Sequence, residues 1–260
     1  MRVTNDDARI DVQIDGRGDD VMVLLAGFPL AREIWDDQTK TLATTHRVVR
    51  PDLRGMGASS VVNGPYLMEN LAADVAAVLD AIGVERATIV GHSAGGYVAL
   101  AFARMYTERV ERLVLVCSRL HADTPDQARS RRDLADRAER ESSMKPIAEA
   151  FIPRLLAPET PAAHPEIVDR VNAIVNATDP RGAAAMLRGM ALRDPADDIA
   201  PELTMPVTII AGARDAVVSI EEYRQTAAAF PHGRLVVCER SGHLPMLEEP
   251  DVVTAALAAN

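Results

Sequence analysis

The chain alternates short apolar runs with helical patterns at both of its ends, and this alternation constrains its fold more than any other feature. Residues 21–26 (VMVLLA) form a continuous apolar run, as expected of a strand that is buried on both faces. Residues 66–82 place their apolar side chains on one helix face, and Gly83 ends that pattern. Strands that alternate with helices form βαβ units. The sequence therefore predicts an α/β fold with a doubly wound, mostly parallel sheet.

The predicted elements divide the chain into a core and an insertion. Strands are expected at residues 9–14, 21–26, 46–52, 87–91, 110–118, 206–215 and 234–238. Helices are expected at residues 31–44, 66–82, 94–106, 125–142, 146–157, 165–192, 220–230 and 246–259. We therefore expect residues 1–118 and 195–260 to form one α/β core, and residues 119–194 to form an inserted helical cap without strands.

Acidic residues outnumber basic ones: 38 Asp and Glu stand against 28 Lys and Arg, for a net charge of -10. Such a balance disfavours binding to nucleic acids and to anionic membranes. The longest apolar stretches are far shorter than the roughly 20 residues that a membrane span needs, and the first residues lack the apolar core of a signal peptide. The sequence favours a cytoplasmic enzyme or binding protein for a small, mostly neutral ligand, and it is compatible with a homo-oligomer.

The two cysteines, Cys117 and Cys238, each end an apolar run. This position is typical of buried thiols, which we expect in neighbouring strands. Two cysteines in a chain of this length do not make a disulfide framework, and neither belongs to a CxxC pair. We expect no metal site and no cofactor.

The segment GHSAG at residues 91–95 joins a predicted strand to a predicted helix. A one-residue turn of this kind forces the serine into a strained conformation that lifts its hydroxyl out of the backbone. Glycines are needed on both sides because the two arms approach too closely for a Cβ atom. Ser93 is therefore the candidate nucleophile. The alternative is a glycine-rich turn in which the serine only caps the helix.

A serine nucleophile needs a base within hydrogen-bond reach and a carboxylate that orients the base. Among the six histidines, His243 follows the last predicted strand, at the sheet edge where the active sites of open α/β sheets gather. Asp215 follows the preceding strand in the same way, and Asp197 and Asp198 are the alternatives. The order Ser93, Asp215, His243 is the order of this type of triad. A structural loop histidine and a helix-capping aspartate are the competing interpretations.

An acyl-transfer site also needs donors for the oxyanion that develops on the carbonyl oxygen. The N–H of Ala94, directly after the nucleophile, is one candidate, and the N–H of Phe28, in the loop after the first buried strand, is the other. The candidate substrate-binding side chains are Phe28, Trp35 and Tyr97. The predicted cap is rich in arginine, Arg131 included, so one of these side chains is a candidate partner for a substrate carboxylate. A solvent-facing position is the default for such arginines.

Five segments together resemble the α/β-hydrolase fold superfamily: AGFP (26–29), PDLRGMGAS (51–59), VGHSAGG (90–96), GARD (212–215) and GHLPMLEEP (242–250). Their order and spacing imply the α/β-hydrolase fold over both parts of the predicted core. They say much less about the reaction. A serine at position 93 excludes the patterns of the superfamily in which an aspartate is the nucleophile.

Within the superfamily, the chain is similar to small bacterial esterases, cofactor-free haloperoxidases (perhydrolases) and 3-oxoadipate enol-lactonases. Phe28-Pro29 resembles the haloperoxidase pattern, which implies perhydrolysis as a side activity. The chain departs from the family at Ala26, where members usually carry a histidine that braces the oxyanion loop. It also departs from the enol-lactonases, because its only tryptophan, Trp35, lies outside the predicted cap.

These observations predict a serine hydrolase that cleaves small carboxylic esters or lactones through an acyl-enzyme. Enol-lactone hydrolysis, perhydrolysis and acyl transfer are alternatives that use the same triad. A ligand receptor with slow turnover, built on the same fold, is the alternative outside enzymes. The expected partner is a small-molecule ester or lactone, with no nucleic acid and no membrane involved.

Overall fold

The computed structural model describes residues 1–259 and contains an eight-stranded sheet. The strands are β1 (Arg2–Asn5), β2 (Ala8–Asp15), β3 (Val21–Leu25), β4 (Arg47–Pro51), β5 (Ala87–His92), β6 (Val110–Val116), β7 (Val207–Gly212) and β8 (Gly233–Cys238). Their order across the sheet is β1-β2-β4-β3-β5-β6-β7-β8. The β1–β2 and β2–β4 pairs are antiparallel and all others are parallel, which confirms the predicted fold class.

The burial of each strand follows its place in the sheet. Every residue of β3, β5 and β7 is buried, because helices cover both faces there, whereas β2 alternates buried and more exposed positions. The parallel register pairs Leu25 with Gly91, Gly91 with Leu115, and Leu115 with Ile209. The carboxyl ends of four neighbouring strands therefore meet at one edge of the sheet.

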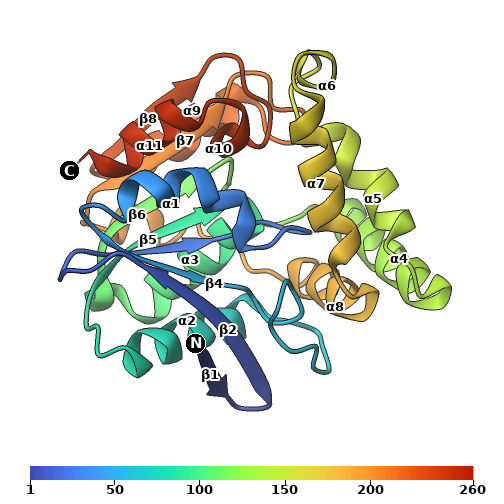
Figure 1. Ribbon diagram of the computed structural model, residues 1–260, viewed down its shortest axis with the longest axis horizontal. Coiled ribbons are helices and arrows are strands. Elements are labelled where there is room, and N and C mark those ends of the chain that lie inside the picture. The colour runs from blue at the N-terminus through green and yellow to red at the C-terminus, as the bar shows by residue number, and fades with distance from the viewer. Residues whose placement is uncertain (260) are drawn as a thin grey trace.

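Helices cover both faces of this sheet (Figure 1). Helices α1 (Asp36–Leu42) and α11 (Pro250–Ala258) contact each other on one face, and α2 (Met68–Ala81) and α3 (Ala94–Met105) contact each other on the opposite face. Helix α9 (Ile220–Ala228) packs on β7 and β8, and the short α10 (Pro245–Glu248) precedes α11. The predicted helix at 246–259 is thus two helices, because Pro250 cannot continue the first one.

The segment between β6 and β7 holds five α-helices and lies to one side of the sheet (Figure 1). They are α4 (Pro125–Glu141), α5 (Lys145–Phe151), α6 (Thr160–Ala163), α7 (Pro165–Ala177) and α8 (Pro180–Met190). The prediction of one helix over 165–192 is wrong. Thr178 is extended, Asp179 caps the next helix by accepting a bond from the N–H of Arg181, and Pro180 begins α8.

Two further expectations need correction. The edge strand β1 has no counterpart among the predicted strands, because a four-residue run with one buried side chain carries no clear apolar pattern. Cys117 and Cys238 are free and buried as predicted, but they do not belong to neighbouring strands, because β7 lies between β6 and β8.

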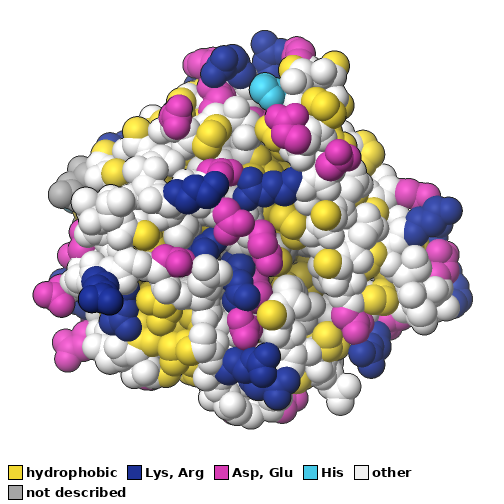
Figure 2. All heavy atoms as spheres, viewed as in Figure 1, with side chains coloured by type: hydrophobic (Ala, Val, Ile, Leu, Met, Phe, Trp, Pro, Cys, Tyr) yellow, Lys and Arg dark blue, Asp and Glu magenta, His cyan; other side chains and the backbone are white. Residues whose placement is uncertain are grey.

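Within the described chain, no helix has the length and apolar character to cross a membrane. On the face shown in Figure 2, basic and acidic side chains are interspersed, with no broad area of one sign.

Candidate active site

Ser93 occupies a sharp turn between β5 and α3. Its backbone has φ +50° and ψ -116°, the strained conformation that the motif predicts. A Cβ atom on Gly91 would lie 2.3 Å from the carbonyl oxygen of Gly95, and one on Gly95 would lie 2.6 Å from that of Leu25. The turn can therefore form only with glycine at both positions. Ser93 itself remains partly exposed, unlike its neighbours.

The structure brings Ser93, His243 and Asp215 into one hydrogen-bonded row. The Ser93 Oγ atom lies 2.9 Å from Nε2 of His243, and Nδ1 of the same ring lies 2.6 Å from Oδ2 of Asp215. The side chains of His243 and Asp215 are 3% and 0% exposed. This arrangement lets the imidazole accept the serine proton on one nitrogen while the carboxylate fixes its tautomer through the other.

Asp215 is held by further donors. Its Oδ1 accepts bonds from the backbone N–H groups of Val217 (2.6 Å) and Val218 (3.2 Å), and its Oδ2 accepts a bond from the Tyr223 hydroxyl. Burial by itself raises the pKa of Asp215, but His243, Tyr223 and the backbone donors lower that pKa by more, so it lies below its usual value. The carboxylate is therefore ionised at neutral pH.

The sequence analysis missed Tyr223, which lies on α9 and is fully buried. Burial raises the pKa of its hydroxyl well above the usual value, so the group stays protonated and acts as a donor to Asp215. The only available signal was its place eight residues after a candidate acid. That spacing does not by itself predict the contact with Asp215, because the contact depends on the conformation of the turn between β7 and α9.

His92, which directly precedes Ser93, contacts the loop of the candidate base. It is fully buried, and its Nε2 lies 2.9 Å from the carbonyl oxygen of His243. Its Nδ1 has no hydrogen-bond partner in the described part of the chain. Burial, with a contribution from His243, lowers the pKa of His92 to about 3. His92 is therefore a neutral donor that fixes the backbone beside His243.

The loop after β3 lies directly against the nucleophile. A Cβ atom on Gly27 would lie 2.8 Å from Cβ of Ser93 and 2.5 Å from Nδ1 of His92. Within residues 1–259, the N–H groups of Phe28 and Ala94 donate to no other group. Two free backbone donors thus flank Ser93, as an oxyanion site requires.

The three candidate substrate-binding side chains differ in placement. Trp35 is fully buried in a short 3₁₀ helix (Arg32–Trp35), so no atom of its ring is open to a ligand in this structure. The Phe28 ring meets Phe151 of α5 edge-on, with 5.2 Å between the ring centroids. Tyr97 lies one turn after Ser93 on α3, with the Arg193 guanidinium 3.9 Å above its ring.

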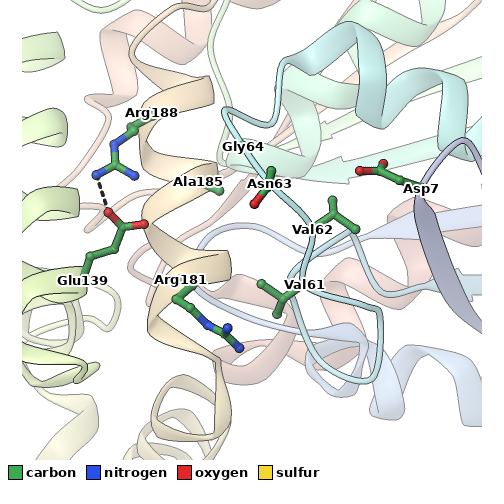
Figure 3. Close-up of a pocket in the computed structure, with 9 residues that line it drawn as sticks. All are labelled: Asp7, Val61, Val62, Asn63, Gly64, Glu139, Arg181, Ala185 and Arg188. Carbon is green, nitrogen blue, oxygen red and sulfur yellow. Dashed lines mark hydrogen bonds and ion pairs between the residues drawn. The ribbon is translucent and has the colours of Figure 1, made fainter.

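The alternatives for the acid lie elsewhere. Asp197 pairs with His121, and Asp198 pairs with Arg104, so neither contacts His243. A groove of about 610 Å³ lies between residues 61–64 and α8 (Figure 3), where Arg188 pairs with Glu139. None of Ser93, Asp215 and His243 lines this groove.

Cys117 completes a group of metal-type ligands with Asp215 and His243, whose ligand atoms all lie within 4.8 Å of one another. The donor set does not suit a cation. Burial raises the pKa of the Cys117 thiol well above its usual value, and the thiolate is the form that binds metals. The atoms of Asp215 and His243 that face each other already form a hydrogen bond, so neither is free to bind a metal ion.

Comparison with known proteins gives matches over almost the whole chain. A sequence profile of the alpha/beta hydrolase family matches residues 22–256. The chain is 28% identical over 229 residues to 3-oxoadipate enol-lactonase 2 from Acinetobacter baylyi, covering 87% of this chain and 82% of that protein. A thermophilic esterase from Thermogutta terrifontis, solved with malate bound, matches with a TM-score of 0.95 at 36% identity, covering 99% and 96% of the two chains. An enol-lactonase from Burkholderia xenovorans matches with a TM-score of 0.91 at 25% identity, covering 99% and 98%.

Proposed function

Because this chain belongs to the alpha/beta hydrolase family, we propose that it is a serine hydrolase that cleaves small carboxylic esters or lactones. The observation that carries this proposal is the row of hydrogen bonds from Ser93 through His243 to Asp215. The similarity to an esterase and to enol-lactonases supports the same substrate classes. No step of the reaction below needs a group other than protein atoms and water.

In the first half of the reaction, Ser93 Oγ attacks the carbonyl carbon while its proton passes to Nε2 of His243. The oxyanion of the tetrahedral intermediate accepts bonds from the N–H groups of Phe28 and Ala94. A single donor of this kind contributes roughly 3–4 kcal/mol of transition-state stabilisation. The imidazolium then gives its proton to the leaving alcohol oxygen, and the acyl group stays on Ser93.

In the second half, a water molecule loses a proton to His243 and attacks the acyl carbon. The same two N–H groups bind the second oxyanion. When that intermediate collapses, Ser93 Oγ leaves and takes the proton back from Nε2. Asp215 remains ionised throughout, because four donors already hold its two oxygens.

Residues 119–194 act in this proposal as a cap over the carboxyl edge of the sheet. The N–H of His243 donates to the carbonyl oxygen of Leu155 at 3.0 Å, which ties the cap to the loop of the base. Phe151 lies against Phe28 of the oxyanion loop. Side chains of the cap therefore determine which ester or lactone reaches Ser93.

The test is release of p-nitrophenol from p-nitrophenyl acetate and butyrate by the wild type and by Ser93→Ala. We expect the variant to lose roughly 10⁴- to 10⁶-fold in kcat, because Ser93 and His243 act as one unit. Ser130→Ala removes an exposed hydroxyl from α4 and is the matched control, expected to keep wild-type rates.

Two results would contradict the proposal. Undiminished turnover by Ser93→Ala would place the chemistry at another group. Release of at most one equivalent of p-nitrophenol by the wild type would show that deacylation fails, and a receptor or an acyltransferase would then be the better account.

A further inference from the structure

Three arginines come together beside the candidate site, and we call Arg119, Arg131 and Arg193 the arginine cluster. They come from three different places in the chain: the loop after β6, helix α4, and the segment just after α8. Asp123 links two of them, since it pairs with Arg119 (3.3 Å) and with Arg131. The cluster is therefore an assembled feature of the fold and not a run of charges in the sequence.

The cluster adjoins the nucleophile turn. Arg119 directly follows Ser118, whose Oγ donates to the carbonyl oxygen of Ser93 at 2.9 Å. Tyr97, whose N–H donates to the same carbonyl oxygen, carries the Arg193 guanidinium on its ring face. Two arginines thus lie against the elements that hold Ser93.

Arg119 also reaches helix α9, which follows the candidate acid. Strand β6 lies between β5 and β7, so the loop after it leaves the sheet between Ser93 and Asp215. Nη1 of Arg119 lies 3.8 Å from the carboxylate of Glu222, the residue before Tyr223. Arg119 therefore lies on the loop that leaves the carboxyl edge of the sheet between the strands that precede Ser93 and Asp215.

The cluster carries more positive than negative charge. The side chains of Arg119 and Asp123 are 13% and 3% exposed, and Asp123 is shared between two guanidinium groups. Among residues 1–259, Arg193 has no carboxylate partner, and it donates instead to the carbonyl oxygens of Leu120 and His121. Three cations thus face two carboxylates, Asp123 and Glu222.

Part of the donor capacity of the cluster is unused. The Nε atoms of Arg119 and Arg193 are buried and have no acceptor among the described residues. Burial lowers the pKa of Arg193, and the like charges of Arg119 and Arg131 add to that effect. Arginine nevertheless stays charged in proteins, so a positive charge in excess remains next to the site. An anion that binds the outer guanidinium nitrogens would relieve the repulsion.

We propose that the arginine cluster recognises a carboxylate on the substrate. The substrate would then be a half-ester of a dicarboxylic acid, or a lactone that carries a free carboxylate. Guanidinium groups bind a carboxylate through paired N–H donors, which gives both affinity and a fixed orientation of the scissile carbonyl. This inference rests on the proposed function, because it assigns the substrate of the same site. It differs from the expectation of a mostly neutral ligand, and the experiment below distinguishes the two.

The experiment compares esters that differ only in the second carboxylate. Monomethyl glutarate and monomethyl adipate are paired with methyl pentanoate and methyl hexanoate, and the released acid is titrated at constant pH. We expect the wild type to favour each anionic ester by tenfold or more in kcat/KM over its neutral partner. Arg119→Gln should lower this preference roughly tenfold, at the lower end of the range for the loss of a charge-assisted hydrogen bond. Arg129→Gln removes an exposed charge from α4 and should keep the wild-type preference.

The outcomes separate this inference from the proposed function. Hydrolysis of the neutral esters with no preference for the anionic ones would overturn the inference alone. Loss of all ester hydrolysis in the wild type would overturn both. An anionic preference that survives in Arg119→Gln and in Arg131→Gln would place the carboxylate elsewhere.

If these variants do not fold, inhibition of the wild type gives the answer without them. Glutarate and pentanoate are compared as competitive inhibitors of p-nitrophenyl acetate hydrolysis. We expect glutarate to bind at least tenfold more tightly than pentanoate. Equal inhibition by the two acids would overturn the inference.

Discussion

Tyr223 shows how a single side chain adjusts the candidate base from a distance. Its hydroxyl donates to Oδ2 of Asp215, the same oxygen that accepts the Nδ1 proton of His243. The two donors compete for the charge on that oxygen. Tyr223 does not touch a reacting atom, so we regard it as a positioning residue.

At this scale we predict that Tyr223→Phe lowers kcat for p-nitrophenyl acetate roughly 3- to 10-fold. Without the hydroxyl, Asp215 loses one of its four donors and fixes the imidazole of His243 less firmly. The rates of both proteins are measured with p-nitrophenyl acetate. Tyr106→Phe, at the end of α3, is the control and should keep the wild-type rate. An unchanged kcat in Tyr223→Phe would show that the hydroxyl does not help to position the base.

The sequence indicated Ser93, Asp215 and His243 as candidates, and the structure brings them together. Each carries a local signal: a glycine-flanked turn, or a place directly after a strand. Tyr223 and Arg193 carry no such signal. Their contacts depend on how α9 and the end of α8 are placed, and no period or motif encodes that placement. Trp35 is the opposite case. Its place near the oxyanion loop makes it a candidate for contact with the substrate, but its side chain is fully buried in the core.

Among the elements, the short helix α10 connects the loop of the base to the segment between β6 and β7. Glu248, its last residue, accepts bonds from the N–H of Gly242 (2.7 Å), the N–H of Ala157 (2.8 Å) and the hydroxyl of Thr160 (2.5 Å). One carboxylate thus joins the loop at Gly242 to Ala157 and Thr160, which precede Glu248 by 91 and 88 positions. Both segments adjoin His243.

We predict that Glu248→Ala lowers the free energy of unfolding by about 2–4 kcal/mol, because it leaves three donors without their acceptor. It should also lower kcat, since the backbone around His243 loses its anchor. Urea unfolding and ester hydrolysis measure the two effects. Glu239→Ala removes an exposed carboxylate after β8 and should change neither. Equal behaviour of the two variants would contradict the prediction.

Most elements were predictable from the sequence because strand and helix periods differ and glycine or proline residues mark their ends. The predictions of helices are wrong where the boundary between two helices depends on a single residue. Pro180 and Pro250 each start a new helix inside a continuous apolar pattern, and that pattern does not reveal the break. Strand β1 is defined by pairing with β2, a tertiary property.

At the scale of the whole molecule, stability depends on keeping His92 uncharged in the interior. The pKa of His92 is about 3 in the folded chain, against 6.5 for the free side chain. The unfolded chain therefore binds more protons than the folded chain below pH 6.5. This contribution to stability is fully present above that pH and is lost progressively as the pH falls towards 3.

We predict that the wild type loses about 1 kcal/mol more unfolding free energy between pH 7 and pH 5.5 than His92→Gln does. Glutamine cannot bind a proton, and its amide retains a donor for the carbonyl oxygen of His243. Urea unfolding of both proteins at the two pH values measures the difference. Parallel losses in the two proteins would refute this account of His92.

The hydrogen bonds of the candidate site join residues that are far apart in the sequence, so protein synthesis adds them to the chain at widely separated times. Ser93 and His243 are 150 positions apart, and His92 bonds to a carbonyl group 151 positions away. A chain that has emerged only as far as α8 already holds the nucleophile turn, but it has neither acid nor base. The candidate nucleophile therefore lacks its partners at that stage, and in the proposed mechanism cleavage of a substrate begins only when β7 and β8 have joined the sheet. In the proposed mechanism, hydrolysis therefore indicates that about the last fifth of the chain, from β7 onward, has folded onto the rest.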